Sequence, residues 1–218
     1  MTSSEPTRIK LCGFTRAADI ALACDLGVDF LGLIFAAKSP RALTCVQAER
    51  LRQAVTAPTA VVALFMNNPH AEVAAVVAAV APDVLQFHGD EDEDFCRSFG
   101  RPYIKTMAMG GAQSCDIQAA FVRYRHAWAF LLDGHPPGAA GGSGQGFDWS
   151  RLPRGAEKPL MVAGGLTPEN VYGLVHAHRP WGVDAASGVE SAPGIKDGDK
   201  MRDFVAAVRR ADHEHATG

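Results

Sequence analysis

Two side chains suited to proton transfer stand where strands are expected to end. Asp133 closes an apolar run over 127–133, and eight of the 14 residues that follow over 134–147 are Gly or Pro. Cys12 closes a second apolar run over 8–12. Because a carboxylic acid can protonate a leaving oxygen and a thiolate can take a proton from carbon, the pair is suited to general acid–base catalysis.

Neither group is in its reactive form when unperturbed. A free Asp, with a pKa of about 3.9, is almost fully ionised at neutral pH, and a thiol with a pKa of about 8.5 is only a few per cent thiolate. A catalytic site would therefore have to shift both equilibria. The residues alone leave a simpler alternative open, in which Cys12 is a buried core thiol and Asp133 a turn residue.

Other side chains at expected strand ends are suited to binding an anionic substrate. Amides of small residues can approach a phosphate, a guanidinium can hold a carboxylate with two parallel hydrogen bonds, and imidazole or carboxylate groups can orient a substrate. The candidates for these three tasks, in that order, are Gly164, Gly165, Ser187 and Gly188; Arg41; and His88 and Asp184. Taken alone, the arginine could equally be a solvated surface charge and the histidine a half-buried imidazole.

Composition limits the kinds of protein to consider. The chain has 218 residues, 47% of them hydrophobic, and a formal net charge of −3. This length predicts one domain over 1–218, with a core over about 8–210 and polar tails. The charge argues against a nucleic-acid partner, and no apolar stretch is long enough to span a membrane. Five widely spaced cysteines without a CxxC pair, and a polar N-terminal stretch, predict a cytoplasmic protein without disulfides or a metal site.

Eight short apolar runs alternate with helical segments along the chain. Helix starts are expected at Thr15, Thr44, Asn68-Pro69 and Thr167-Pro168, and a helix end at Gly27. Continuous apolar runs are typical of parallel strands that are covered on both faces. The expected strands are 8–12, 29–35, 59–66, 83–88, 102–109, 127–133, 159–164 and 182–187.

This alternation predicts a closed (β/α)8 TIM barrel of the α/β class. An open doubly wound sheet is the structural alternative, but its phosphate-binding glycines usually follow the first strand, whereas here they follow the sixth and seventh. In a TIM barrel the catalytic groups lie at the carboxyl ends of the strands, which is where the candidate residues stand.

Several motifs together resemble phosphoribosylanthranilate isomerase of tryptophan biosynthesis. The likeness runs in order from about Ile9 to Phe204, and the combination is more specific than any single motif. The motifs are KLCGFTR, GLIFAAKSPRAL, LQFHGDE, LLDGHPPGAAGGSGQGFDW, VAGGLTPENV and GVDAASGVESAPGIKDGDKMRDFV.

The resemblance implies a cofactor-free Amadori rearrangement of N-(5-phosphoribosyl)anthranilate to 1-(2-carboxyphenylamino)-1-deoxyribulose 5-phosphate. It implies that Asp133 is the general acid and Cys12 the general base, with a small phosphosugar as the binding partner. The glycine-rich segment after Asp133 would close over the substrate. Two departures stand out, because Ala186 replaces a frequent Ser and AAGGSGQG replaces a commoner GGTG arrangement. The oligomeric state, monomer or homodimer, stays open.

Two functional alternatives remain at this point. A histidine-pathway aminoaldose isomerase performs the same rearrangement, but that family has an Asp where this chain has Cys12, together with half-barrel symmetry that is not evident here. A non-catalytic phosphosugar-binding barrel would keep the glycines and have no reason to retain Cys12 and Asp133 together.

Overall fold

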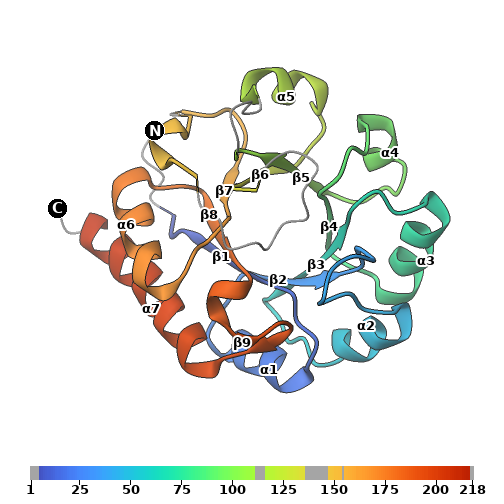
Figure 1. The fold of residues 1–218 in the computed structure, drawn as a ribbon, viewed down its shortest axis with the longest axis horizontal. Coiled ribbons are helices and arrows are strands. Elements are labelled where there is room, and N and C mark those ends of the chain that lie inside the picture. Colours follow the sequence, from blue (N-terminus) through green and yellow to red (C-terminus); the bar gives the residue numbers. More distant parts are fainter. Residues whose placement is uncertain (1–4, 111–115, 136–146, 154, 217–218) are drawn as a thin grey trace.

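The strands form a closed parallel barrel in the order in which they occur in the chain. The computed structural model describes residues 5–110, 116–135, 147–153 and 155–216. Each strand pairs with its successor, and the eighth pairs with the first, which closes the barrel (Figure 1). The strands are β1 (Arg8–Cys12), β2 (Phe30–Ile34), β3 (Ala60–Phe65), β4 (Val84–Phe87), β5 (Tyr103–Ala108), β6 (Ala129–Asp133), β7 (Leu160–Val162) and β8 (Gly182–Ala185). This is the (β/α)8 architecture that the sequence predicts.

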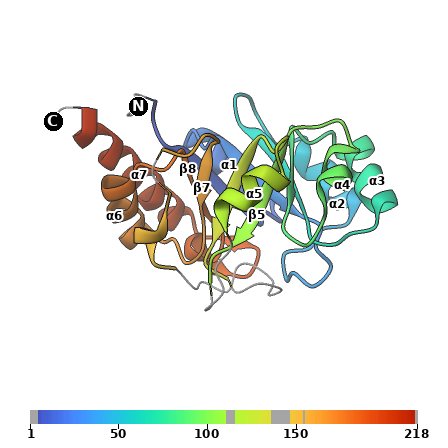
Figure 2. The same ribbon diagram turned by 90° about the horizontal axis from the view of Figure 1, so that it is seen from above.

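Helices surround the barrel and cover its outer face (Figures 1 and 2). Two 3-10 helices and a small antiparallel pair of strands complete the described structure. The α-helices are α1 (Ala17–Asp25), α2 (Cys45–Arg52), α3 (His70–Val80), α4 (Glu93–Arg97), α5 (Ile117–Arg123), α6 (Pro168–His178) and α7 (Gly198–Ala216). The remaining elements are η1 (Trp149–Arg151), η2 (Ser187–Val189), β9 (Glu190–Ala192) and β10 (Ile195–Lys196). No helix of the described residues is long and apolar enough to cross a membrane.

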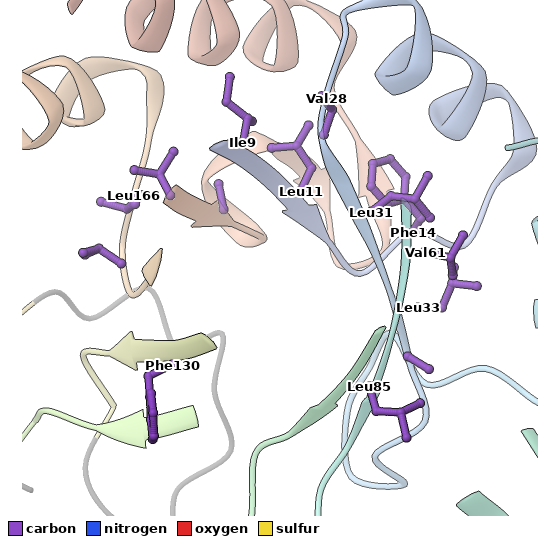
Figure 3. Close-up of a cluster of buried hydrophobic side chains, with 14 of the residues drawn as sticks. Ile9, Leu11, Phe14, Val28, Leu31, Leu33, Val61, Leu85, Phe130 and Leu166 are labelled. Carbon is purple, nitrogen blue, oxygen red and sulfur yellow. The ribbon is translucent and has the colours of Figure 1, made fainter. Parts of the chain in front are cut away.

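Alternate residues of each strand face opposite sides of the barrel wall. Ile9 and Leu11 of β1 point outward to the surrounding helices (Figure 3), where they join the main hydrophobic cluster. Lys10 and Cys12 of the same strand alternate with these residues, so their side chains face the opposite side of the barrel wall. Cys12 packs in a separate small cluster with Ile34, which lies at the end of β2. Whether a strand-end side chain points into or out of the barrel therefore depends on its odd or even position along the strand.

Hydrophobic and polar side chains occupy different levels of the barrel. Eight buried residues form one apolar cluster that is distinct from the outer one, and they are Phe30, Val62, Val84, Ile104, Ala129, Leu131, Met161 and Ala163. Two strand positions further along, polar side chains pair with each other instead. Lys10 Nζ donates to Asp184 Oδ2 at 2.9 Å, and Gln86 Nε2 donates to Thr106 Oγ1 at 3.1 Å. Layers of this kind fill the interior of a TIM barrel.

Contacts between the residue before the first strand and the last helix reinforce the closure. Thr7 Oγ1 donates to Asp212 Oδ1 of α7 at 2.6 Å across a sequence separation of 205 residues. Arg209 Nη1 donates to the Thr7 carbonyl and also lies 3.2 Å from Asp212 Oδ2. The segment that precedes β1 is therefore held against α7.

The predicted strands all exist, and most are shorter than predicted. The strand predicted over 8–12 has those bounds, whereas the run predicted over 182–187 ends at Ala185, because the chain turns there into η2. The hairpin of β9 and β10 was not predicted. Its turn contains Gly194 at φ +78°, and its strands are only three and two residues long, too short for a readable alternation.

Helix signals were correct at three positions and wrong at two. Thr44 caps α2 with a capping box to Gln47, Pro168 occupies the first position of α6, and Gly27 has φ +70° just after α1. Thr15 does not cap α1, because its hydroxyl donates to the Gly194 carbonyl instead. Pro69 is the N-cap of α3 rather than its first helical residue.

Candidate active site

The predicted acid and base lie on one cavity at the carboxyl end of the barrel. Cys12 ends β1 and Asp133 ends β6, and both line a cavity of about 100 Å³. Three further predicted site residues line the same cavity and come from other strand ends or loops: Arg41, His88 and Asp184. Parallel strands bring their carboxyl ends to the same rim. Residues 121 positions apart in sequence (133 − 12) therefore face a common space.

A glycine on the neighbouring strand makes room for the Cys12 thiol. Gly32 of β2 pairs with Cys12 in the barrel register. A Cβ at Gly32 would lie 2.5 Å from Cys12 Sγ, which is far inside van der Waals contact. The thiol is buried, and its burial raises the pKa, which the Lys10 ammonium partly counters. Cys12 is therefore protonated at neutral pH before substrate binds.

An ion pair at the cavity supplies charge next to Cys12. Lys10 and Asp184 are both buried and joined at 2.9 Å. Burial alone would lower the pKa of Lys10, but Asp184 and Cys12 outweigh it, so the pKa is raised. Burial raises the pKa of Asp184, with Lys10 acting in the opposite direction. Asp184 Oδ1 has no hydrogen-bond partner among the described residues, so one oxygen remains available to a ligand.

Asp133 lies beside two stacked imidazoles. The rings of His88 and His135 are 4.6 Å apart between centroids, with an interplanar angle of 23°. The His135 amide donates to Asp133 Oδ1 at 3.3 Å, and His135 Nδ1 lies 3.3 Å from the same oxygen. Burial would raise the pKa of Asp133, but His135 and His88 together hold it below its ordinary value. The pKa of His88 falls to about 4, first because of burial and then because of His135, so this imidazole is neutral at pH 7.

Arg41 is buried and already holds a carboxylate of the protein. Its Nε lies 2.9 Å from Glu190 Oε1 and its Nη2 2.7 Å from Glu190 Oε2, which is a bidentate pair. Lys196 Nζ approaches Glu190 Oε1 at 2.9 Å and also donates to the carbonyls of Cys12 and Ala186. The sequence predicts a substrate contact for Arg41, and the structure adds an internal partner that orients the guanidinium at the cavity.

Apolar side chains form one wall of the cavity. Ile34, Ala36, Leu64 and Met66 line it. Ala186 packs with this group and faces the same space, so the small residue in place of the expected Ser borders the apolar wall. A cavity with apolar walls and a few convergent polar groups is typical of a small-molecule site.

The predicted phosphate-binding residues lie on two adjoining loops next to this cavity. Gly164 and Gly165, after β7, have φ values of +89° and +65°. Ser187 and Gly188 form part of η2, which follows β8. A Cβ at Gly188 would lie 1.9 Å from the carbonyl oxygen of Leu166, so the two loops touch through backbone. Within the described residues, the amides of Gly164 and Gly165 donate to no other backbone group, and both residues are half-buried.

Several site residues were missed by reasoning from the sequence. Lys10 and Gln86 stand two positions before Cys12 and His88, so strand alternation places them on the same face, and this signal was available. Glu190 and Lys196 lie within the motif GVDAASGVESAPGIKDGDKMRDFV, whose local pattern does not indicate a role for either. His135 comes two residues after Asp133 and was passed over as part of the glycine-rich segment.

Some predictions fall outside the described residues. The AAGGSGQG stretch over 139–146 does so, and with it the expected closure over the substrate. Cys115, one of the five cysteines, also lies outside the described residues. Cys24, Cys45 and Cys96 lie on helices, and they and Cys12 are free thiols, in line with the absence of disulfides expected from the spacing of the cysteines.

Three described side chains are arranged in a way that could hold a metal ion. One potential ligand atom from each of His88, Asp133 and His135 lies within 4.8 Å of the others. The sequence predicts no metal site because these residues form no recognisable ligand motif. The barrel brings them together from the ends of β4 and β6.

Comparison with known proteins decides the family. A family model described as N-(5'phosphoribosyl)anthranilate (PRA) isomerase matches residues 9–207. The chain belongs to the phosphoribosylanthranilate isomerase family. A relative from Stenotrophomonas maltophilia, named N-(5'-phosphoribosyl)anthranilate isomerase, is 54% identical over 206 residues, which cover 94% of each chain. A relative of the same name from Xylella fastidiosa is 50% identical, with 97% of this chain and 96% of the relative covered.

Solved structures of this family have the same barrel. The phosphoribosylanthranilate isomerase of Thermotoga maritima superposes with a TM-score of 0.84 at 32% identity, covering 94% of this chain and 99% of that one. Another isomerase structure holds reduced 1-(o-carboxyphenylamino)-1-deoxyribulose 5-phosphate and superposes with a TM-score of 0.78 at 29% identity, covering 94% and 99% of the two chains. The chain is thus an isomerase with the family's TIM barrel, and the cavity at the strand ends is its candidate active site.

Proposed function

We propose that this chain converts N-(5-phosphoribosyl)anthranilate to 1-(2-carboxyphenylamino)-1-deoxyribulose 5-phosphate, as a cytoplasmic step of tryptophan biosynthesis. The observation that carries the proposal is the placement of Cys12 and Asp133 on one cavity, with Arg41 between an apolar wall and a buried carboxylate. Family membership over residues 9–207 supports the substrate class. We further propose that residues 1–218 form one domain that acts without a cofactor.

In the first step Asp133 protonates the ring oxygen of the sugar. The C1′–O bond breaks, and the nitrogen lone pair forms a protonated imine with C1′. In the second step Cys12, as thiolate, takes the proton from C2′, and the electrons of the C–H bond neutralise the imine to give an enolamine. The enolamine then tautomerises to the aminoketose. No atom is gained or lost, so the reaction needs no oxidant or reductant.

The two groups have to change protonation state when substrate binds. In the free protein burial keeps the Cys12 thiol protonated, and the two imidazoles favour ionised Asp133. A protonated imine close to Sγ would stabilise the thiolate, as Lys10 already does in part. A sugar oxygen at Asp133 would favour the neutral acid, and the proton that Asp133 takes up balances the one that Cys12 releases.

Substrate binding follows the division of the site into an apolar cavity and a pair of loops. The anthranilate ring would lie against Ile34 and Leu64, with its carboxylate near Arg41. The phosphate would bind amides of the loops that carry Gly165 and Gly188. The oligomeric state, monomer or homodimer, remains open, although a solved relative at 28% identity consists of monomers generated from the dimeric enzyme of Thermotoga maritima.

A steady-state assay of the purified chain tests the proposal, with the histidine-pathway aminoaldose as a parallel substrate. We expect turnover of phosphoribosylanthranilate, and a loss of kcat of at least about 10²-fold in each of Cys12→Ala and Asp133→Ala. Cys24→Ala is the matched control, because this thiol lies on α1, away from the cavity. A kcat within a few fold of that of the unmodified chain, in both variants, would contradict the assigned roles.

A further inference from the structure

The cluster of His88, Asp133 and His135 has a feature that the proposed reaction does not use. His88 Nδ1 and Nε2 are buried and have no hydrogen-bond partner among the described residues, whereas His135 Nδ1 lies 3.3 Å from Asp133 Oδ1. Buried polar atoms are nearly always paired. The unpaired His88 nitrogens, next to a second imidazole and a carboxylate, therefore indicate a ligand that accepts lone pairs from nitrogen and oxygen together.

The distances suit a single cation. One potential ligand atom from each of the three residues lies within 4.8 Å of the others. Tetrahedral Zn²⁺ with bonds of about 2.0–2.2 Å needs its ligand atoms roughly 3.4 Å apart. Rotation of the side chains has to close the remaining difference. Because the imidazoles are stacked at 4.6 Å with an interplanar angle of 23°, one ring has to turn before both nitrogen lone pairs can meet one ion.

We propose that His88, Asp133 and His135 bind one borderline divalent cation, of which Zn²⁺ is the representative, and that this cation inhibits the isomerase reversibly. Two imidazoles and one carboxylate favour Zn²⁺, Co²⁺ or Ni²⁺ over Mg²⁺ or Ca²⁺, which prefer oxygen ligands. The cation would take the carboxylate that the reaction needs as an acid, so occupied protein would not turn over substrate.

Among the described residues, the cluster borders two cavities. His88 and Asp133 line the cavity that contains Cys12. His88 and His135 also line a neighbouring cavity of about 390 Å³ next to α5. A cation can therefore enter without rearrangement of the barrel, and a substrate molecule in the first cavity would compete with it.

Metal binding can be measured without reference to turnover. The full chain, freed of metal with a chelator, is titrated with Zn²⁺ against a coloured competing chelator and, separately, with Co²⁺ while the visible absorption is recorded. We expect one ion per chain and a Co²⁺ spectrum typical of nitrogen and oxygen ligands. A stoichiometry of zero, or a thiolate charge-transfer band from the free cysteines, would overturn the proposal.

Matched variants locate the site. His135→Gln should weaken Zn²⁺ affinity at least about tenfold, and His178→Gln should leave it unchanged, because His178 is exposed on α6. Asp133→Asn serves as a second probe of the same site, should the first variant not fold. Equal Zn²⁺ affinity in the folded site variants and the His178→Gln control would refute the site.

Inhibition adds a readout that is separate from the proposed function. We expect Zn²⁺ to inhibit the unmodified chain competitively with substrate, and His135→Gln to require at least about ten times more Zn²⁺ for the same inhibition. An inactive chain that still binds Zn²⁺ would refute the proposed function and leave the metal site standing. An active chain that Zn²⁺ does not inhibit would refute the inhibitory role.

Discussion

Replacing Glu190 by Gln tests the buried charge network that orients Arg41. The Glu190 side chain is only 4% exposed and holds two cations, Arg41 at 8% exposure and Lys196 at 0%. Glutamine has nearly the same shape but no charge, so the substitution leaves two buried cations without their counter-ion. Removal of one partner from a buried pair typically costs about 3–5 kcal/mol.

This cost can be measured as a loss of thermal stability. For a chain of this size, 1 kcal/mol corresponds to a shift in Tm of about 2–4 °C, so we expect Glu190→Gln to melt roughly 6–20 °C lower. Glu49→Gln is the matched control, because Glu49 is exposed on α2 and should change stability by less than about 0.5 kcal/mol. Calorimetry or circular dichroism at pH 7 gives both values.

The pH dependence of the Tm difference between Glu190→Gln and the unmodified chain is a stricter test. Burial would raise the pKa of Glu190, but Arg41 and Lys196 outweigh it, so the folded pKa lies below the ordinary 4.5. A carboxylate with a lowered pKa stabilises the fold above its unfolded pKa, and this contribution is lost as the pH falls through the folded pKa. The difference in Tm between Glu190→Gln and the unmodified chain should therefore become smaller below about pH 4.5. Equal Tm values at pH 7, or a gap that widens in acid, would refute the reasoning.

Four further predictions concern three glycines and the thiol. Gly32→Ala should lower kcat by about 10²-fold, because the new Cβ would displace Cys12 Sγ, and steady-state kinetics would show it. Gly188→Ala should raise KM for the phosphorylated substrate more than it lowers kcat, since its Cβ collides with the Leu166 carbonyl; an unchanged KM would argue against a phosphate loop. Gly173→Ala, on the open surface of α6, controls for both and should stabilise by about 0.5–1 kcal/mol. In the free chain, less than about 1% of Cys12 is thiolate at pH 7, because its pKa is raised from 9.0; alkylation followed by mass spectrometry should accelerate about tenfold per pH unit without a plateau below pH 9.

The barrel and the strand-end residues were predictable because they depend on local pattern. Cys12 and Asp133 could be placed on one rim from the end of each apolar run and from the rule that parallel strands share a direction. A role for Lys10 was equally predictable. Strand alternation puts Lys10 on the same face of the strand as Cys12, and a polar residue inside a buried strand needs a partner.

Pairings between distant loops were not predictable in the same way. Arg41 and Glu190 are 149 residues apart, and their contact depends on how the β9–β10 hairpin folds back on the barrel. Nothing in the local pattern around either residue specifies the other. The same holds for the stacking of His88 on His135, which arises from two loops whose conformations depend on tertiary contacts.

The hydrogen bonds that join the start of β1 to α7 help to close the barrel, so β1 has neighbours on both sides like every other strand. Arg8 and Asp29 meet across 21 residues of chain, whereas Thr7 and Asp212 meet across 205. Loop-closure entropy grows only as (3/2)RT ln n, so the longer closure costs about 2 kcal/mol more than the shorter one. A circular permutant that joins these neighbouring ends and opens the chain in an exposed helix–strand connection should recover the same barrel, because each strand keeps both of its partners.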